Sequence, residues 1–380
     1  MKKIYILLIS VFILYILCGC GGNPLTQTVK IAVMGNQADF YPGYKEGIER
    51  AVNDLNKEYA DSGCTVEYEF YNDNGNYEKG AAIIDTLASD KSITAVIGAV
   101  DMDINKTAAH VFNEAEKLFV IPFFLYDSVY EDNYYDTVFS LCNSAKTVGD
   151  ILRGAAADTK AKRWAVCAAE GEFERTEMNG FLQNSAADGI AVVDCASMSM
   201  LVNQFDEVYK YWDILGVEGV VMFPSGSEGF DILKKIKKKN PDIICAGDTA
   251  FDNSVVMDND PELLAAMNGF IMADEFMLRN EADGENSLIT DMEEEYKQKT
   301  GNDFDVWYIQ AYNAVRMIAD TAIQNRVFNS ADIAKLLHEN DYNGLYQRFK
   351  CDEKGLQVTD VFKYSVMDER GYFEEYELKD

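Results

Sequence analysis

Hydrophobic positions in the first part of the chain alternate between two spacings. Short apolar runs rich in β-branched residues are typical of buried strands, and apolar stripes at three- and four-residue spacing are typical of helices. The strand-like runs cover residues 29–34, 66–70, 95–98 and 118–122, and the helical stripes cover residues 44–59, 77–87 and 104–115. This alternation predicts an α/β fold with a doubly wound parallel sheet.

The same alternation starts again after Cys142. Strand-like runs cover residues 164–168, 190–194, 219–223 and 241–246, and helical stretches cover residues 176–187, 205–215, 229–239 and 307–325. The C-terminal part has the pattern of turn-linked strands at residues 346–349, 361–366 and 372–378. We therefore expect two α/β lobes of similar build in one chain.

The N-terminal residues form a separate segment. Two lysines precede an apolar run over residues 4–17, which is short for a membrane span and fits the hydrophobic region of a secretory signal. The Leu-Cys-Gly-Cys sequence that follows resembles a bacterial lipobox. It predicts a signal peptide over residues 1–19, a diacylglyceryl thioether on Cys20 and a tether over residues 20–28. Ordinary signal cleavage and a single-pass anchor are the alternatives.

Charge and motifs narrow the class of function. The 380 residues include 64 acidic and 34 basic side chains, a net charge of −30 that would repel the phosphates of a nucleic acid. The apolar fraction of 48% rules out a disordered chain. Phosphate-binding glycine loops and the G-x-S-x-G elbow are absent, and the two histidines stand apart. The sequence therefore supports no catalytic activity, no cofactor and no metal site.

Six cysteines follow Cys20 in the expected mature chain. They are Cys64, Cys142, Cys167, Cys195, Cys245 and Cys351. None has the spacing of zinc ligands, and most lie in apolar strand-like runs, which favours buried free thiols. An exported compartment also permits disulfides, and Cys167 with Cys195 is the first candidate pair because their strands are expected to be neighbours.

Six stretches of the chain match, in the same order, a pattern found in one known family. They are residues 29–33, 43–56, 95–98, 119–122, 306–315 and 352–355, and they are spread over nearly all of residues 29–380. With these stretches, an exported chain of two successive α/β lobes resembles the periplasmic-binding-protein type I family. More narrowly, it is similar to the leucine/isoleucine/valine-binding (branched-chain amino acid) branch of ABC-transporter substrate-binding lipoproteins.

The resemblance implies a division of the chain. Two lobes joined by three crossings are expected, with the crossings near residues 140–144, 270–275 and 342–346. Lobe I would comprise residues 29–141 plus 274–342, and lobe II would comprise residues 144–270 plus 346–380.

The resemblance also implies a function. The chain would be an extracytoplasmic lipoprotein, held to the cell membrane by its lipid, that captures a small polar molecule (an amino acid, amide or amine) in the cleft between the lobes. It would deliver this molecule to the subunits of an ABC permease, without a cofactor and without nucleic acid. The alternative is a lipoprotein that senses a ligand and signals to a membrane receptor or kinase.

The site implied by the resemblance carries acids in unusual places. Asp101, Met102 and Asp103 follow the strand at residues 95–98, where relatives place hydroxyl groups that hold the carboxylate of an amino acid. A carboxylate ligand would be repelled there. Alternatively, Asp103 is only the N-cap of the next helix. Asp248 falls where an acid often pairs with the amine of the ligand.

The other candidates for ligand contact are aromatic and hydroxyl side chains in the expected site loops. They are Tyr41, Phe123, Phe124, Tyr126, Phe173, Ser225 and Ser227. Each aromatic side chain is equally consistent with core packing. Carboxylates, including Asp127 and Glu228, beside aromatic faces suit a cationic ligand through charge pairing and cation–π contact.

Overall fold

The computed structural model describes most of the chain beyond the N-terminal segment. The described residues are 27–36, 42–98, 101–123, 126–130, 133–251, 254–273, 287–301, 306–346, 348–358, 363–370 and 373–377. Cys20 and the predicted signal peptide lie outside them. Across the part that is described, no helix combines the length and the apolar character needed to cross a bilayer.

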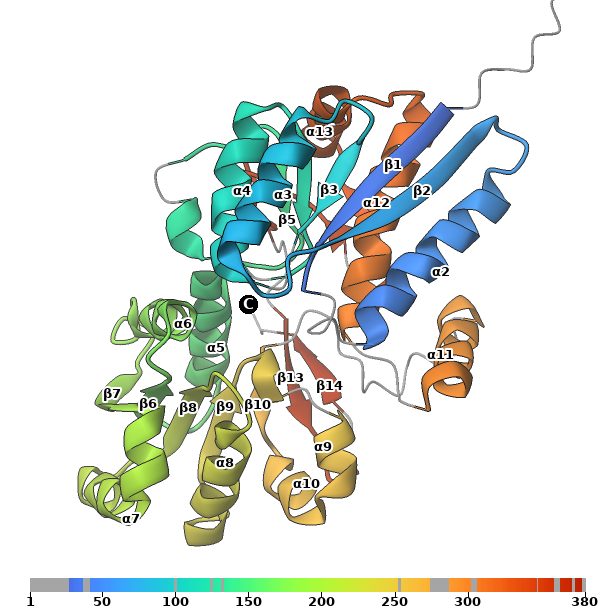
Figure 1. Ribbon diagram of the computed structural model, residues 1–380. Helices are drawn as coiled ribbons and strands as arrows, with labels where there is room; N and C mark the ends of the chain where they lie inside the picture. The colour runs from blue at the N-terminus through green and yellow to red at the C-terminus, as the bar shows by residue number, and fades with distance from the viewer. Residues whose placement is uncertain are drawn as a thin grey trace, which may run out of the picture.

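A five-stranded parallel sheet forms the centre of the first lobe, in the order β2-β1-β3-β4-β5 (Figure 1). Its strands are β1 (Gln27–Gly35), β2 (Cys64–Asn72), β3 (Ala95–Ile97), β4 (Leu118–Ile121) and β5 (Val138–Ser140). Every residue of β3 and β4 is buried, as expected for parallel strands that are covered on both faces. We call this sheet with its helices lobe I.

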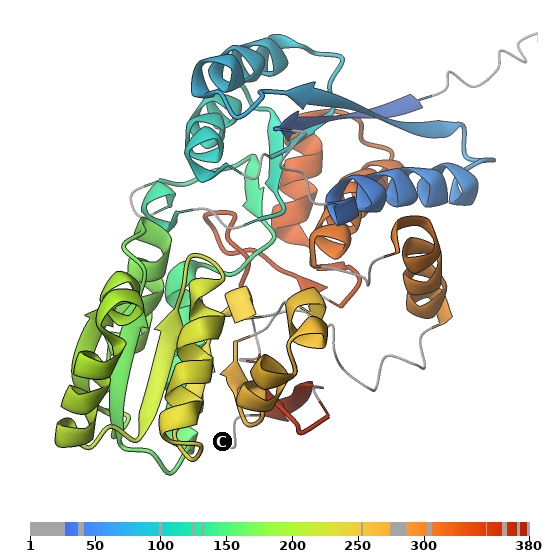
Figure 2. The ribbon, with the colours of Figure 1, turned by 60° about the horizontal axis from the view of Figure 1, so that its bottom comes forward.

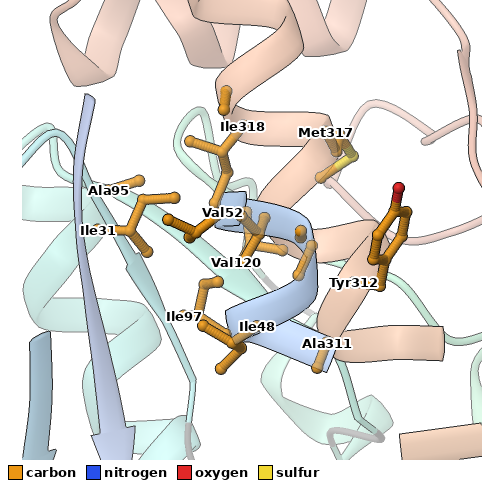
Figure 3. Close-up of a cluster of buried hydrophobic side chains, with 14 of the residues drawn as sticks. Ile31, Ile48, Val52, Ala95, Ile97, Val120, Ala311, Tyr312, Met317 and Ile318 are labelled. Carbon is orange, nitrogen blue, oxygen red and sulfur yellow. The ribbon is translucent and has the colours of Figure 1, made fainter. Parts of the chain in front are cut away.

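Helices cover both faces of this sheet. They are α2 (Pro42–Glu58), α3 (Tyr77–Ser89), α4 (Met102–Glu114), α11 (Ser287–Thr300), α12 (Val306–Asn325) and α13 (Ser330–Glu339). Alternate strand residues point to opposite faces. Ile31, Ile97 and Val120 therefore face α2 and α12 (Figure 3), whereas Ala32 and Val96 face α3 and α4.

The second lobe contains a seven-stranded sheet in the order β14-β13-β10-β9-β8-β6-β7. The strands are β6 (Arg163–Ala168), β7 (Ala191–Ser197), β8 (Gly219–Phe223), β9 (Ile244–Gly247), β10 (Ile271–Met272), β13 (Lys363–Met367) and β14 (Phe373–Glu377). Strands β6 to β10 are parallel, and the hairpin of β13 and β14 joins the edge of β10 in antiparallel orientation. We call this sheet with its helices lobe II.

Helices also cover both faces of the second sheet (Figures 1 and 2). They are α5 (Ala145–Asp158), α6 (Glu172–Leu182), α7 (Met198–Leu215), α8 (Glu228–Lys239), α9 (Ser254–Asn259) and α10 (Pro261–Met267). The core between the sheet and helices α5 and α6 contains Trp164 and Phe181, whereas helices α7 to α10 enclose the other face. Two covered parallel sheets in one chain confirm the predicted fold class.

The chain returns to lobe II later than expected. The short hairpin of β11 (Tyr342–Asn343) and β12 (Arg348–Phe349) places Phe349 in the core of lobe I, and Leu356 packs against the other face of the same sheet. Leu356 forms a parallel bridge with Ser140, whose N–H donates to the carbonyl of Gly355 at 3.0 Å. Residues 355 and 356 are therefore held at the open edge of β5, in lobe I. The crossing to lobe II was expected at residues 342–346, but the chain still packs on lobe I at Leu356.

Two helices begin earlier than the sequence pattern predicts. Helix α7 was expected from residue 205 and begins at Met198, because the Ser197 hydroxyl accepts a hydrogen bond from the Met200 N–H at 3.2 Å. Gln204 has non-helical backbone angles, and the expected start lies just after this interruption. Helix α6 begins at Glu172 rather than at residue 176.

The six described cysteines are free thiols. Cys195 is opposite Val166 in the pairing of β6 with β7, and Ala196 is opposite Cys167. Neighbouring residues of a strand point to opposite faces, so the side chains of Cys167 and Cys195 lie on different sides of the sheet. The structure therefore gives no support to the candidate disulfide.

The close contact between α5 and α6 gives a first prediction. A Cβ atom on Gly180 would lie 2.2 Å from the carbonyl oxygen of Lys146 and 3.2 Å from the Cα atom of Gly149. Gly180→Ala should therefore lower the free energy of unfolding by about 1–3 kcal/mol, despite the better helix propensity of alanine. Urea denaturation measures the free energy of unfolding. Asn179→Ala is the control, because Asn179 is exposed on the same helix. Equal stability of the two variants would contradict the contact.

Candidate functional site

The loops that follow β4 and β6 meet between the lobes. The 3-10 helix η1 (Asp127–Val129) follows β4, and Val129 is buried in the core of lobe I. The hydroxyl of Ser128 donates a hydrogen bond to the carboxylate of Glu172 at the start of α6. The carboxyl ends of strands from both sheets are thus brought together, which is where open parallel α/β sheets bind ligands.

Asp127 ties the two lobes through a helix terminus. Its two carboxylate oxygens accept hydrogen bonds from the N–H groups of Ala145 and Lys146 at 3.0 and 3.1 Å. These residues form the first turn of α5, whose N–H groups have no partner within the helix. Asp127 of lobe I is therefore engaged in capping a helix of lobe II.

Carboxylates from both lobes gather around Tyr126, which is half-buried. Burial raises the pKa of its hydroxyl, and nearby negative charges raise it further. These charges belong to Asp103, Glu172, Asp101 and Glu174, in decreasing order of effect. Asp101 and Asp103 lie at the start of α4, and the two glutamates lie in the first turn of α6. Both lobes therefore contribute acidic side chains to the candidate site.

The start of α4 differs in one respect from the expectation. The carboxylate of Asp101 accepts a hydrogen bond from the N–H of Ile104 at 3.0 Å, so Asp101 is the N-cap. The prediction that Asp103 caps this helix is wrong, because Asp103 already lies in the first helical turn whereas Asp101 has the extended backbone of a cap. Both acids are exposed, and Met102 is half-buried.

Phe123 lies in the core of lobe I. Its ring centroid is 5.1 Å from that of Tyr44 and 4.3 Å from that of Trp307, and its side chain is buried. Two further aromatic candidates, Tyr41 and Phe124, lie outside the described residues. The aromatic contacts of Phe123 are those of a packed core residue.

Three candidates lie at the same end of the lobe II sheet. Phe173 is half-buried in the first turn of α6. Ser225 and Ser227 follow β8 and are exposed; the N–H and hydroxyl of Ser225 donate to Glu228 at 3.0 and 3.3 Å. The Ser227 side chain makes no capping bond to α8.

Asp248 belongs to a buried pair of acids. It follows β9 and is only 5% exposed, and its carboxylate accepts a hydrogen bond from the N–H of Ala250 at 3.1 Å. Glu177 of α6 is 1% exposed and close enough to Asp248 for the two carboxyl groups to shift each other's pKa. Burial raises the pKa of Asp248 to about 7 and that of Glu177 well above its ordinary value.

Sequence reasoning missed Glu177, although the chain contains a signal for it. Phe173, Glu177 and Phe181 are spaced four residues apart and share one face of α6. An acid between two aromatic residues on the buried face of a helix is unusual, because a buried carboxylate needs a partner. The position of Glu177 between two aromatic residues therefore indicates that its carboxyl group has a partner, either in the protein or in a ligand.

Residues 29–367 match the sequence model of a periplasmic binding protein family. The chain belongs to this family. The match covers both lobes and confirms the resemblance read from the sequence motifs at the level of family and fold. A comparison with curated proteins found no match.

Solved structures of similar fold come from several solute-binding proteins. An ABC transporter substrate-binding protein from Desulfitobacterium hafniense in complex with leucine has a TM-score of 0.75 at 20% identity, over 92% of this chain and 100% of that one. LivJ from Streptococcus pneumoniae with isoleucine has a TM-score of 0.72 at 15% identity, over 92% and 100%. A solute-binding protein of R. palustris with benzoate has a TM-score of 0.70 at 14% identity, over 92% and 96%.

Family membership gives this periplasmic binding protein a solute-binding role outside the cytoplasm. The family and these structural neighbours consist of substrate-binding proteins rather than enzymes. Within the described ranges, no group of three or more His, Cys, Asp or Glu side chains is arranged to hold a metal ion. The chemistry to be explained is therefore the binding of a small solute.

The buried acids predict a pH-dependent stability. The pKa values of Glu177 and Asp248 are raised on folding, so between about pH 4 and pH 7 the folded chain holds protons that the unfolded chain has lost. Their contribution to the free energy of unfolding must fall as the pH rises through this window, by at most about 1.4 kcal/mol per pH unit for each proton.

Urea denaturation of wild type and of Glu177→Gln at several pH values measures this contribution. The free energy of unfolding of the variant minus that of wild type should increase from about pH 5 to pH 7, because only the wild type loses the contribution of Glu177 over this range. Glu207→Gln, which changes an exposed glutamate of α7, should give a difference that stays constant. A constant difference for Glu177→Gln as well would contradict the raised pKa values.

Proposed function

We propose that this periplasmic binding protein is a lipoprotein, anchored through Cys20, that binds a small polar solute with a positively charged amine between its lobes and delivers it to an ABC permease. The observation that carries the ligand class is the buried acidic pair of Asp248 and Glu177 at the carboxyl end of β9. Family membership supports the solute-binding role, and the lipobox-like sequence supports the anchor.

The acids around the site favour an amine over a carboxylate. Asp101, Asp103, Glu172 and Glu174 act on one tyrosine from both lobes, so a carboxylate placed there would meet four like charges. Lys106 is the opposing charge: its ammonium group lies 5.9 Å from the centroid of the Tyr126 ring. This lysine shows that the ring of Tyr126 already attracts a cation.

Asp248 is the acid best placed to hold the amine. The Coulomb attraction between opposite charges is stronger at a buried site than at an exposed one, because water screens it less. Asp101 and Asp103 are exposed, whereas Asp248 is buried. The carboxylate of Asp248 would therefore supply most of the charge pairing, and the surrounding exposed acids would raise the local concentration of cationic solutes.

A thermal-shift screen of the chain without its signal peptide tests the ligand class. The panel includes choline, putrescine, glycine betaine, α-amino acids, amides, sugars and benzoate. We expect amines without a carboxylate to raise the melting temperature; a ligand at 100 times its Kd adds about 2.7 kcal/mol of stability. A shift with ordinary α-amino acids but not with simple amines would contradict the proposal.

Asp248→Asn should then weaken the binding of the amine found in the screen by about 30-fold or more, since loss of one member of a buried charge pair costs roughly 2–5 kcal/mol. Isothermal titration calorimetry measures the affinity. Asp242→Asn is the matched control, because Asp242 is exposed at the opposite end of β9 and should bind like wild type. Unchanged affinity of Asp248→Asn would remove Asp248 from the site.

The anchor gives a separate prediction. Cys20→Ser removes the thiol that would carry the diacylglyceryl group, so the chain should no longer incorporate radiolabelled fatty acid and should leave the membrane fraction. Cys18→Ser should leave the labelling unchanged. Labelling of the Cys20→Ser chain would overturn the assignment.

A further inference from the structure

The ammonium group of Lys106 lies over the ring of Tyr126. Lys106 belongs to the second turn of α4, and Tyr126 comes directly before η1, beyond the carboxyl end of β4. The ammonium nitrogen is 5.9 Å from the ring centroid, within the range in which an aromatic face attracts a cation. Both side chains are half-buried. The protein itself therefore supplies a cation to this ring.

Tyr126 lies where the two lobes meet. The residue after it, Asp127, accepts hydrogen bonds from two N–H groups of α5, and the hydroxyl of Ser128 donates to the carboxylate of Glu172 on α6. Both α5 and α6 belong to lobe II. The ring thus stands beside the contacts between the lobes, at the edge where open α/β sheets bind ligands.

Lys106 has an acid near it but no ion pair. Asp103 precedes it by three residues and so lies on the same face of α4. In the part of the chain that the structure describes, no carboxylate oxygen is within ion-pairing distance of the Lys106 ammonium group. Its contact with the Tyr126 ring is a cation–π contact at a partly exposed site, which is a weak interaction. A second cation can therefore take its place.

We propose that Lys106 is a tethered cation that occupies the ring of Tyr126 until a cationic solute displaces it, and that it thereby lowers the affinity of the site for such solutes. This inference rests on the proposed function, which places an amine between the lobes, and adds Lys106 as a residue that determines specificity. One face of the ring holds one ammonium group at a time, because two like charges in contact repel each other.

The displaced ammonium group has another place to go. Lysine has a flexible stem of four carbons, and the carboxylate of Asp103 is one helical turn away on the same face of α4. The exchange therefore costs about the strength of one cation–π contact. Such a contact corresponds to a factor of about two to five in affinity at a partly exposed site.

Lys106→Gln tests the competition, because it removes the tethered charge and keeps a long polar side chain. Choline is the probe, since its charge does not depend on pH. Titration calorimetry of the full mature chain with choline should give a Kd about two to five times lower for Lys106→Gln than for wild type. A higher Kd for the variant would mean that Lys106 assists binding, and would overturn the inference.

Lys79→Gln is the matched control. Lys79 is an exposed lysine in the first turn of α3, and this turn lies beside α4, since the Tyr77 and Thr107 hydroxyls are 2.7 Å apart. The control thus removes the same charge from the same edge of lobe I without touching the Tyr126 ring. Its affinity for choline should stay close to that of wild type. An equal gain in both variants would show a general effect of charge and would overturn the inference.

Nuclear magnetic resonance of the ligand-free chain tests the contact by itself. In a chain labelled with ¹³C-lysine, the ring current of Tyr126 should move the ε-methylene protons of Lys106 upfield, and Lys106→Gln identifies their signal by its loss. Tyr126→Leu should return this signal to the position of the other lysines, and saturating choline should do the same in the wild-type chain. A normal position without ligand, or an upfield shift that persists with saturating choline, would overturn the inference.

These measurements separate the inference from the proposed function. If choline binds wild type and Lys106→Gln with the same Kd, the inference fails and the proposed amine ligand stands. If choline binds only Lys106→Gln, both are supported, because the tethered cation then blocks the site. If no amine of the panel binds either chain, the proposed ligand class fails and the inference fails with it.

Discussion

A parallel sheet must be covered on both faces, and this constraint organises the whole chain. Each connection between two parallel strands has to cross a face of the sheet, so these connections contain the helices that cover it; the β13–β14 hairpin, which is antiparallel, is the exception in the lobe II sheet. The carboxyl ends of β3 and β4 therefore open onto one edge of lobe I, and those of β6, β8 and β9 onto one edge of lobe II. The loops that we propose to bind solute are the ones that this constraint leaves at the edge.

The same edge collects the N-termini of helices, which explains much of its acidity. Asp101 caps α4, Asp127 accepts hydrogen bonds from two N–H groups in the first turn of α5, and Glu172 and Glu174 lie in the first turn of α6. Acids at helix N-termini are stabilised by free N–H groups and by the helix dipole. They would be expected there whatever the protein binds. The buried acids Glu177 and Asp248 lack this explanation, and for this reason they carry the argument for a cationic ligand.

Periodic segments of the sequence predicted the fold well. The long helix expected at residues 307–325 is α12, Val306–Asn325, and the strand expected at residues 219–223 is β8. Helix α5 was missed, although the sequence contains its N-cap: the hydroxyl of Ser144 accepts a hydrogen bond from the N–H of Thr147 at 3.1 Å. Asp127, which lies 18 residues before Ala145, adds further hydrogen bonds to the same helix start, and this contact exists only once η1 of lobe I is folded. Local patterns contain the Ser144 cap but not the contact with Asp127.

The candidate site was predictable only in part, for a related reason. The position of Asp248 after a buried strand placed it at the ligand edge, but its neighbour Glu177 looked like one more acid in the acidic start of α6. The packing of α6 on α5 decides its surroundings. Gly149 and Gly180 let the two helix backbones approach so closely that a Cβ atom on Gly149 would lie 2.0 Å from the carbonyl oxygen of Glu177. A helix held this closely cannot rotate to expose Glu177, so the fold itself imposes the cost of burying its carboxyl group, and a proton or a bound cation is what offsets that cost.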